Sequence, residues 1–471
     1  MTRAPFDVAV IGAGVVGAAI ARELSRYRLE VALVEAGPDV GAGTSKANTA
    51  IWHTGFDATP GTLEAALVRR GHDLLADYAV PAGIPIEGVG ALLVAWNEDE
   101  LAALDGIEEK ARANGYPAAA RLTAEEVYAA EPNLASRALG GLRIPDEGII
   151  CPFTTPLAFA TQAMVNGAAL LLDTQVAGAR DEEGVTVLLG PGGREVAARY
   201  VVNAAGLNSD VLDRMFGHET FTVTPRRGEL IVFDKLARGL VSHVLLPVPT
   251  KMGKGVLVAP TVFGNVMLGP TAEDIEDRAG TQSTPAGLRG LLEKGRAIMP
   301  RLLEEEVTAV YAGLRAATEH ADYQIAADPD RRYVCVGGIR STGLTASMAI
   351  AEHVAGMLKE VGLELSPKDE FAPIRMPNLG EALPRPYQDD ARIRAHPQYG
   401  RIVCHCERAT EGEIRDACHA PIPARSVDGL RRRTRATLGR CQGFFCSARV
   451  AELLGAETGR PVEAILGLED E

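Results

Sequence analysis

The chain has 471 residues, enough for about three domains of ~150 residues, and 46% of them are hydrophobic against 23% charged. This balance excludes a mostly disordered chain and predicts a large core that needs no disulfide bonds. The 48 Lys and Arg against 62 Asp and Glu leave a formal net charge of −14, which disfavours nucleic acid and anionic lipid as partners. Seven cysteines, six of them after residue 334, do not suit a secreted disulfide framework.

No targeting or membrane segment is apparent from the sequence. The longest apolar stretch, 8–21, is broken by glycine and is shorter than the ~20 residues that a membrane-spanning helix needs. A motif of a folded domain already occupies residues 12–17, where a cleaved leader would lie. We therefore expect a cytoplasmic protein, attached to the inner membrane at most through a partner.

The predicted elements alternate between strands and helices. The first 36 residues predict a βαβ unit, with strands at 7–11 and 30–35 around a helix at 18–27. Further β-branched runs predict strands at 91–95, 185–189, 200–203, 230–233, 256–259 and 333–336. Helical patterns occupy 61–78, 99–114, 156–166 and 344–359. The order predicts an α/β fold with antiparallel strands inserted.

The last quarter of the chain changes character. Six prolines between residues 363 and 400 predict a linker without regular elements. Residues 401–471 then carry five cysteines and a cluster of arginines, which indicates a separate small domain.

A glycine-rich motif in the first βαβ unit predicts a nucleotide site. Gly12, Gly14 and Gly17 fit G-x-G-x-x-G, which combines a tight turn, a close approach to a pyrophosphate and close helix packing. The following helix presents unpaired N–H groups to the phosphates. Glu35 lies 18 residues after Gly17 at the end of the second strand, where its carboxylate can bind ribose hydroxyls and disfavours NADP.

Three later segments favour FAD over NAD. They are 173–176, the strand that runs into small residues at 201–206, and the strand-to-helix turn at 337–345. Together they resemble the FAD-dependent oxidoreductase family typified by D-amino-acid oxidase. The resemblance implies a Rossmann-type FAD domain from 1–85, 145–215 and 325–362, and an antiparallel substrate domain from 86–144 and 216–324. It places the FAD contacts at Gly12, Gly14, Gly17, Glu35, Thr44, Ser45, Val176, Ala205, Gly206, Gly338, Gly343, Leu344 and Thr345.

The resemblance is stronger to one subfamily. Segments 48–55, 60–63, 225–229 and 313–316 are similar to L-2-hydroxyglutarate dehydrogenases and to glycerol-3-phosphate dehydrogenases of the anaerobic type. Those enzymes carry His-Ser-Gly where this chain has His-Thr-Gly at 53–55. Asp57 and Ala58 replace aromatic residues common there, and Arg340 replaces an acidic one, and these changes lie where we expect the substrate to bind.

Three residues are candidates for the chemistry. Removal of a hydride from a secondary alcohol needs a base for the hydroxyl proton, and His53 has a suitable intrinsic pKa near 6.5, although a structural histidine is the alternative. Arg315 would hold a substrate carboxylate or phosphate with two parallel bonds, or else form an ordinary ion pair. Arg340 is a candidate second anion contact or flavin contact, while Lys251 and Lys254 fit a solvated loop that a phosphate could approach.

Two close pairs of cysteines predict a metal site in the last domain. Cys404 and Cys406 precede Cys441 and Cys446 by a gap of 34 residues. The C-x-C spacing is less natural for zinc than C-x₂₋₄-C, although zinc remains an alternative. The pattern resembles the bacterioferritin-associated-ferredoxin-like domain, which implies a 2Fe–2S cluster on these four thiolates. Six arginines between Arg425 and Arg440 would balance its charge or dock an acidic partner.

The combined sequence features predict an FAD-dependent dehydrogenase. It would oxidise a secondary alcohol of a small anion, glycerol 3-phosphate or a 2-hydroxy acid. Its electrons would leave through the cluster to a redox partner subunit or a quinone-linked acceptor. The alternatives are a dehydrogenase of amines or secondary amino acids, and a flavoenzyme whose zinc-stapled module only binds a partner.

Overall fold

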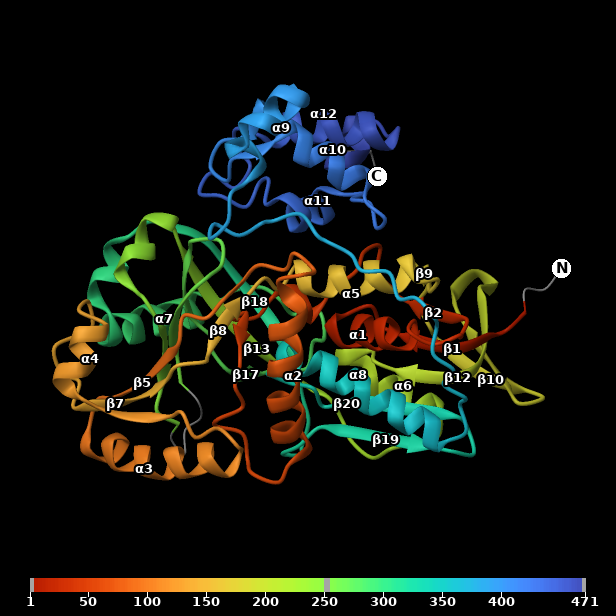
Figure 1. The fold of residues 1–471 in the computed structure, drawn as a ribbon, viewed down its shortest axis with the longest axis horizontal. Coiled ribbons are helices and arrows are strands. Elements are labelled where there is room, and N and C mark those ends of the chain that lie inside the picture. The colour runs from red at the N-terminus through yellow and green to blue at the C-terminus, as the bar shows by residue number, and fades with distance from the viewer. Residues whose placement is uncertain (1–3, 250–254, 468–471) are drawn as a thin grey trace.

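The structure is a computed structural model that describes residues 4–249 and 255–467. Figure 1 shows a large body of sheets and helices, with a small helical C-terminal domain on one side of it. The predicted loop lysines, Lys251 and Lys254, lie outside the described residues. No helix in the described ranges is both long and apolar enough to cross a bilayer.

The first sheet has eight strands, and its central strands are parallel. The path β10-β11-β12-β1-β2-β9 is extended by β20, which pairs with β12, and by β19, which pairs with β20. Parallel pairing joins β9, β2, β1, β12 and β20, so their carboxyl ends meet at one edge, where doubly wound folds bind ligands. The strands are β1 (Phe6–Ile11), β2 (Val31–Val34), β9 (Ala169–Leu171), β10 (Gly178–Glu182), β11 (Val185–Leu189), β12 (Glu195–Asn203), β19 (Gln324–Asp328) and β20 (Tyr333–Gly337).

Apolar helices pack beside this sheet. Helix α1 packs on α5 and α8, and α2 packs on α8. Helix α1 begins at Val15, three residues before the predicted start, because Gly14 is its N-cap and the Ser45 hydroxyl accepts the Val15 N–H. The helices are α1 (Val15–Leu24), α2 (Leu63–Ala79), α5 (Thr154–Val165), α6 (Ser209–Met215) and α8 (Gly343–Glu360).

A second, nine-stranded sheet is inserted between parts of the first. Its pairings are antiparallel except for the parallel pair β14–β5, and its longest pair is β13 with β18. The strands are β5 (Ala91–Ala95), β6 (Ala120–Thr123), β7 (Gly140–Ile144), β13 (Thr224–Phe233), β14 (Val244–Pro247), β15 (Leu257–Pro260), β16 (Val266–Gly269), β17 (Glu273–Asp274) and β18 (Val307–Ala317). Helices α3 (Glu98–Ala113), α4 (Ala124–Ala130) and α7 (Pro285–Ile298) accompany them. This architecture confirms the predicted fold class.

A three-stranded sheet brings together residues far apart in the chain. It consists of β3 (Ile51–Trp52), β4 (Ile86–Glu87) and β8 (Gly148–Ile150), with β8 in the middle. The antiparallel register sets Ile51 opposite Ile149 and Trp52 opposite Gly148. The next residues along each strand, His53 and Glu147, therefore face each other.

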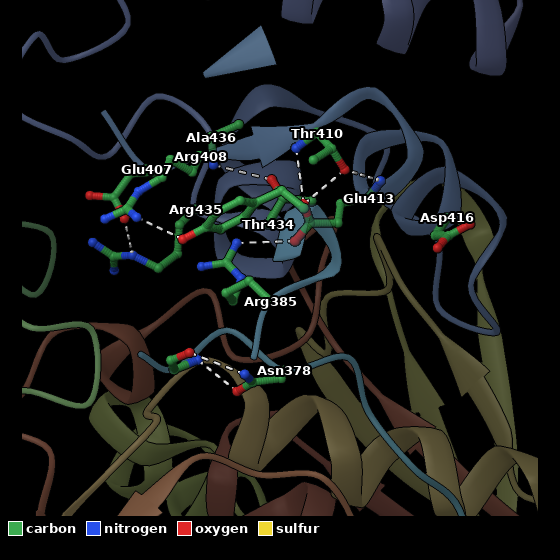
Figure 2. A network of polar contacts seen from close by, with 12 residues as sticks. Asn378, Arg385, Glu407, Arg408, Thr410, Glu413, Asp416, Thr434, Arg435 and Ala436 are labelled. Carbon is green, nitrogen blue, oxygen red and sulfur yellow. Dashed lines mark hydrogen bonds and ion pairs between the residues drawn. The ribbon is translucent and has the colours of Figure 1, made fainter. Parts of the chain in front are cut away.

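The proline-rich segment 363–400 is an ordered strap that packs along the body. Met376 N donates to Ala82 O, and Lys368 N donates to Arg26 O. The expectation that it holds no regular element was wrong, because α9 (Asp390–Ala395) forms between two prolines with the Asp389 side chain as its N-cap. Figure 2 shows Arg385 of the strap pairing with Glu413 of the C-terminal domain.

The C-terminal domain is a small helical unit with its own core. A short hairpin precedes four helices, and the core packs aliphatic side chains around Cys404 and Cys446. The elements are β21 (Ile402–Cys404), β22 (Ala409–Thr410), α10 (Glu411–His419), α11 (Val427–Thr434), α12 (Ser447–Thr458) and α13 (Val462–Leu466).

Candidate cofactor and active site

The glycine motif forms the turn between β1 and α1. Gly12 has φ +103°, and a Cβ there would lie 2.4 Å from the carbonyl oxygen of Ala204, so only glycine fits. A Cβ on Gly17 would lie 1.8 Å from Gly12 O, which shows how closely the helix approaches the turn. The amino end of α1 thus presents N–H groups beside a loop that admits a phosphate.

Glu35 is held rigidly where β2 ends. Its Oε2 accepts the Ala13 N–H at 2.7 Å and its Oε1 accepts the Gly37 N–H at 2.8 Å. The loop after β9, which leads to Val176, lies beside it, since Thr174 N donates to Glu35 O. The carboxylate is therefore fixed at the sheet edge where it would meet ribose hydroxyls.

The structure gathers most of the other expected FAD contacts at the same edge. Ala205 and Gly206 follow β12, Gly338 follows β20, and Gly343 and Leu344 begin α8. They converge because each follows the carboxyl end of one of the joined parallel strands.

Three hydroxyl-bearing candidates make contacts inside the protein. Thr44, in the turn after Gly43, donates to Leu314 O at 2.9 Å, and Ser45 accepts the Val15 N–H at 2.9 Å. Thr345 is fully buried, and its hydroxyl accepts the His53 N–H at 3.0 Å and donates to Ile51 O. Thr345 therefore ties α8 to the segment that carries His53.

His53 is paired with a buried carboxylate. Its Nδ1 lies 3.2 Å from Oε2 of Glu147, whose side chain is fully buried. The other oxygen of Glu147 accepts the Thr54 N–H at 2.7 Å and the Thr54 hydroxyl at 2.9 Å. Threonine at this position therefore keeps a hydroxyl that holds the carboxylate.

Arg315 lies on β18 with its charge uncompensated. A Cβ on Gly228 would lie 2.7 Å from its Nη2, so this glycine makes room for the guanidinium. Nη2 donates to Thr271 O at 3.3 Å, and no carboxylate pairs with Arg315 within the described residues. Burial and then the nearby Arg226 charge lower the pKa of Arg315. Such a cation is suited to an anionic ligand.

Arg340 is placed differently from Arg315. It follows β20 near the start of α8, and its Nη2 donates to Ala321 O at 2.9 Å. His53 follows β3, Arg315 lies in β18 and Arg340 follows β20, so the three residues expected to perform the chemistry come from three different sheets.

A cavity of about 820 Å³ lies between the body and the C-terminal domain. One wall includes Thr44 and Asn48 of the segment after β2, together with Gly313 of β18. The opposite wall includes Arg435 and Gln442 of the C-terminal domain. Its size is within the range of ~300–1,000 Å³ usual for ligand pockets. A Cβ on Gly313 would lie 2.1 Å from Ala47 O, so glycine lets β18 pack closely against the segment that carries Thr44.

The four expected metal ligands gather in two pairs. The Cys406 thiol contacts that of Cys441, and the Cys404 thiol contacts that of Cys446. Burial and the neighbouring Cys404 raise the pKa of Cys446 to about 12, whereas N–H groups led by that of Phe445 lower the pKa of Cys441. Among the described side chains, no three His, Cys, Asp or Glu converge to hold a single ion. Two thiol pairs fit a two-iron cluster, which is held by four thiolates.

The arginine cluster docks the C-terminal domain onto the body. Arg433 donates two bonds of 2.7 Å to the buried Asp39, which Arg432 also binds at 2.5 Å. Arg440 pairs with Asp234 at 2.7 Å, and Arg435 lies 3.9 Å over the Phe263 ring. The expectation that these arginines form a patch for an external partner was wrong for these four side chains, because their charges meet groups of the same chain.

The carboxylates that pair with His53 and with the arginine cluster were not predicted from the sequence. They lie in turns or loops and match no motif: Glu147, Asp39, Asp234 and Glu407, the last of which accepts a hydrogen bond from Arg435. Their only signal is burial, and burial depends on the tertiary structure.

Two family models match the chain. One described as "FAD dependent oxidoreductase" matches residues 7–357, and one described as "BFD-like [2Fe-2S] binding domain" matches residues 402–456. Glycerol 3-phosphate dehydrogenase of Caloramator mitchellensis is 38% identical over 461 residues, which cover 96% of this chain and 95% of that protein. L-2-hydroxyglutarate dehydrogenase of Arabidopsis thaliana is 28% identical over 74% of this chain and 82% of its own.

A solved structure also aligns closely with the larger body. Dithionite-reduced L-α-glycerophosphate oxidase from Mycoplasma pneumoniae, with FAD bound, aligns with a TM-score of 0.75 and 29% identity. The alignment covers 80% of this chain and 100% of the oxidase. About a fifth of this chain therefore lies outside the alignment.

Proposed function

The chain belongs to the FAD-dependent oxidoreductase family and ends in a BFD-like [2Fe-2S] domain, and from this premise we propose that it is a glycerol-3-phosphate dehydrogenase. Its cofactors are FAD and a 2Fe–2S cluster. The observation that carries the substrate assignment is Arg315, a partly buried guanidinium without a carboxylate partner among the described residues. A phosphate would supply the missing negative charge and accept two parallel hydrogen bonds.

The residues around the substrate would divide the work between them. Arg315 binds the anion, and His53 removes the proton of the secondary hydroxyl as the C–H bond breaks and the C=O bond forms. FAD, held by the residues of the FAD domain, would supply the acceptor for the hydride that leaves the carbon. Gly12, Gly14 and Glu35 would hold its pyrophosphate and ribose. We assign 86–144 and 216–324 to the substrate domain, and the remaining body up to 362 to the FAD domain.

Electrons would leave through the C-terminal domain. Gln442, the neighbour of the ligand Cys441, lines the same cavity as Thr44 and Asn48. Cys404, Cys406, Cys441 and Cys446 would hold the cluster, which transfers one electron at a time. The acceptor would be a redox partner subunit or a quinone-linked protein.

A 2-hydroxy acid is the second candidate substrate. Arg315 would bind a carboxylate with the same geometry as a phosphate, and a relative 28% identical to this chain is an L-2-hydroxyglutarate dehydrogenase. A phosphate carries more charge, so it neutralises a partly buried cation more completely.

Anaerobic reduction of the purified holoenzyme tests the assignment. Glycerol 3-phosphate, L-2-hydroxyglutarate and proline would each be added without oxygen while the oxidised-flavin absorption band is followed. We expect rapid bleaching with glycerol 3-phosphate. Bleaching by L-2-hydroxyglutarate alone would support the second candidate, and bleaching by proline alone would refute both.

A further inference from the structure

The carboxylate of Glu147 has one oxygen anchored and the other directed at His53. Oε1 accepts the Thr54 N–H and hydroxyl, and the side chain is fully buried. Oε2 lies 3.2 Å from His53 Nδ1, which is an ion-pair distance, and among the described residues this buried oxygen accepts no hydrogen bond. A buried carboxylate is costly unless its oxygens are bonded, so this placement specifically favours an Nδ1–H on the imidazole.

We propose that Glu147 is a positioning residue that keeps His53 in the tautomer with the proton on Nδ1 and the lone pair on Nε2. The inference rests on the proposed role of His53 as the base. The hydroxyl proton of the substrate moves to Nε2, and the imidazolium that forms is stabilised by the Glu147 carboxylate, which itself keeps its charge. Glu147 touches neither substrate nor cofactor and acts only through the imidazole.

The surrounding backbone fixes both partners. The register of β3 and β8 places His53 opposite Glu147. A Cβ on Gly148 would lie 2.6 Å from Glu87 O, so the turn that carries Glu147 is closely packed. Thr345 accepts the His53 N–H, and His72 Nδ1 lies 3.1 Å from His53 O. These contacts fix the backbone that carries each side chain.

Glu147 and His72 are titratable side chains that contact His53. Glu147 approaches the imidazole from the turn before β8, and the His72 ring contacts His53 O from α2. Burial and then the Arg69 charge lower the pKa of His72, which favours its neutral form. Glu147 therefore brings a negative charge to the imidazole, and this charge favours the imidazolium that forms in the reaction.

The same chain offers a matched control. Glu131 is also fully buried, and its Oε1 accepts the backbone N–H groups of Ser242 and His243 and lies 2.8 Å from His243 Nδ1. Glu131 follows α4 and His243 precedes β14, and neither residue lines the cavity. Replacing either glutamate with glutamine therefore disturbs a similar buried pairing.

The test compares Glu147→Gln with Glu131→Gln in the holoenzyme. In Glu147→Gln the amide would donate to Nδ1, move the imidazole proton to Nε2 and remove the base. We expect kcat to fall at least about 100-fold with KM within about threefold of wild type. The acidic limb of the kcat/KM profile should move to lower pH, because loss of the carboxylate weakens proton binding to the base. Glu147→Asp should return the acidic limb to its wild-type pH, and Glu131→Gln should leave the limb at that pH.

Nitrogen NMR gives a readout that needs no turnover. With ¹⁵N-histidine and a His53→Asn variant for assignment, the wild-type His53 should show the Nδ1–H tautomer, and Glu147→Gln should shift it toward Nε2–H. An unchanged tautomer, or a fall in kcat with no movement of the acidic limb, would overturn the positioning role. The NMR result is independent of the substrate, so failure of glycerol 3-phosphate to reduce the flavin would refute only the proposed function.

Discussion

At the scale of single residues, the substrate site depends on how each charged side chain is paired within the protein. Arg315 has its guanidinium in a space opened by Gly228, and its Nη2 donates to Thr271 O. Arg226, opposite it on β13, is bonded at 2.5 Å to Asp274 near the surface. The two arginines are paired in the strand register but differ in their partners. Arg226 has a carboxylate partner, and Arg315 has none among the described residues.

We expect Arg315→Lys to raise KM for glycerol 3-phosphate about 10- to 100-fold, because the ammonium keeps the charge but loses the planar fork. Steady-state kinetics of wild-type and variant preparations with equal flavin content would measure this change in KM. Arg226→Lys is the control and should change KM less than about twofold, since exposed pairs contribute little. Equal effects of the two substitutions would remove Arg315 from the substrate site.

At the scale of elements, the turn between β1 and α1 decides whether the cofactor is held. Gly12 combines φ +103° with a backbone oxygen where a Cβ would lie. Gly61, before α2, has a similar φ of +82° but open space around the Cβ position. Comparing the two positions separates backbone strain from collision.

We expect Gly12→Ala to be purified with less than about a tenth of the wild-type FAD and to lose ~3 kcal/mol or more of stability, since strain and collision add. Gly61→Ala should keep its FAD and lose only ~1 kcal/mol. The flavin-to-protein absorbance ratio and denaturant unfolding would give both quantities. Full FAD occupancy in Gly12→Ala would contradict the assigned pyrophosphate turn.

At the scale of the whole molecule, ion pairs set the C-terminal domain against the cavity. Burial alone would raise the pKa of Asp39, but the hydrogen bonds and charges of Arg433 and Arg432 outweigh it and lower that pKa. The pKa of Asp39 in the folded protein is then below the unfolded value of about 3.9. The stabilisation that the Asp39 charge gives to docking is therefore complete above pH ~4 and is lost as the pH falls through the folded pKa. Docking should therefore be insensitive to pH near neutrality and weaken in acid.

We expect Asp39→Asn to weaken docking by about 3–5 kcal/mol, because two buried arginines lose their counter-charge. Limited proteolysis should then cut the strap 363–400 faster, and cluster reduction by substrate should slow. Asp369→Asn, which breaks an exposed pair with Arg28, is the control and should leave both rates unchanged. An unaltered cutting rate in Asp39→Asn would show that other contacts suffice to hold the domain.

The relay itself is tested at Cys441. Cys441→Ser should leave bleaching of the flavin by substrate within about twofold of wild type and abolish electron delivery to a one-electron acceptor, since a cluster with a lost thiolate is not assembled normally. Electron paramagnetic resonance of the reduced protein would report the cluster directly. Cys418→Ser replaces a buried thiol outside the four ligands and should keep the signal. Wild-type delivery by Cys441→Ser would make the domain a structural appendage.

The sequence alone determined the features whose parts lie close together in the chain. The first βαβ unit, its glycines and Glu35 could be predicted because a phosphate turn needs those residue types within about 30 positions. The four cluster ligands could also be predicted, because Cys404 lies close in sequence to Cys406 and Cys441 lies close to Cys446. The fold class followed from the alternation of strands and helices.

Only the tertiary structure decided which charges meet. Asp39 and Arg433 are 394 residues apart, and Thr54 and Glu147 are 93 apart, yet each pair is bonded. An acid in a loop matches many possible partners, and packing of distant segments selects one of them and removes it from water. The same packing turned the arginine cluster from an apparent docking patch into an internal interface, because charges in a sequence carry no record of the surface they will face.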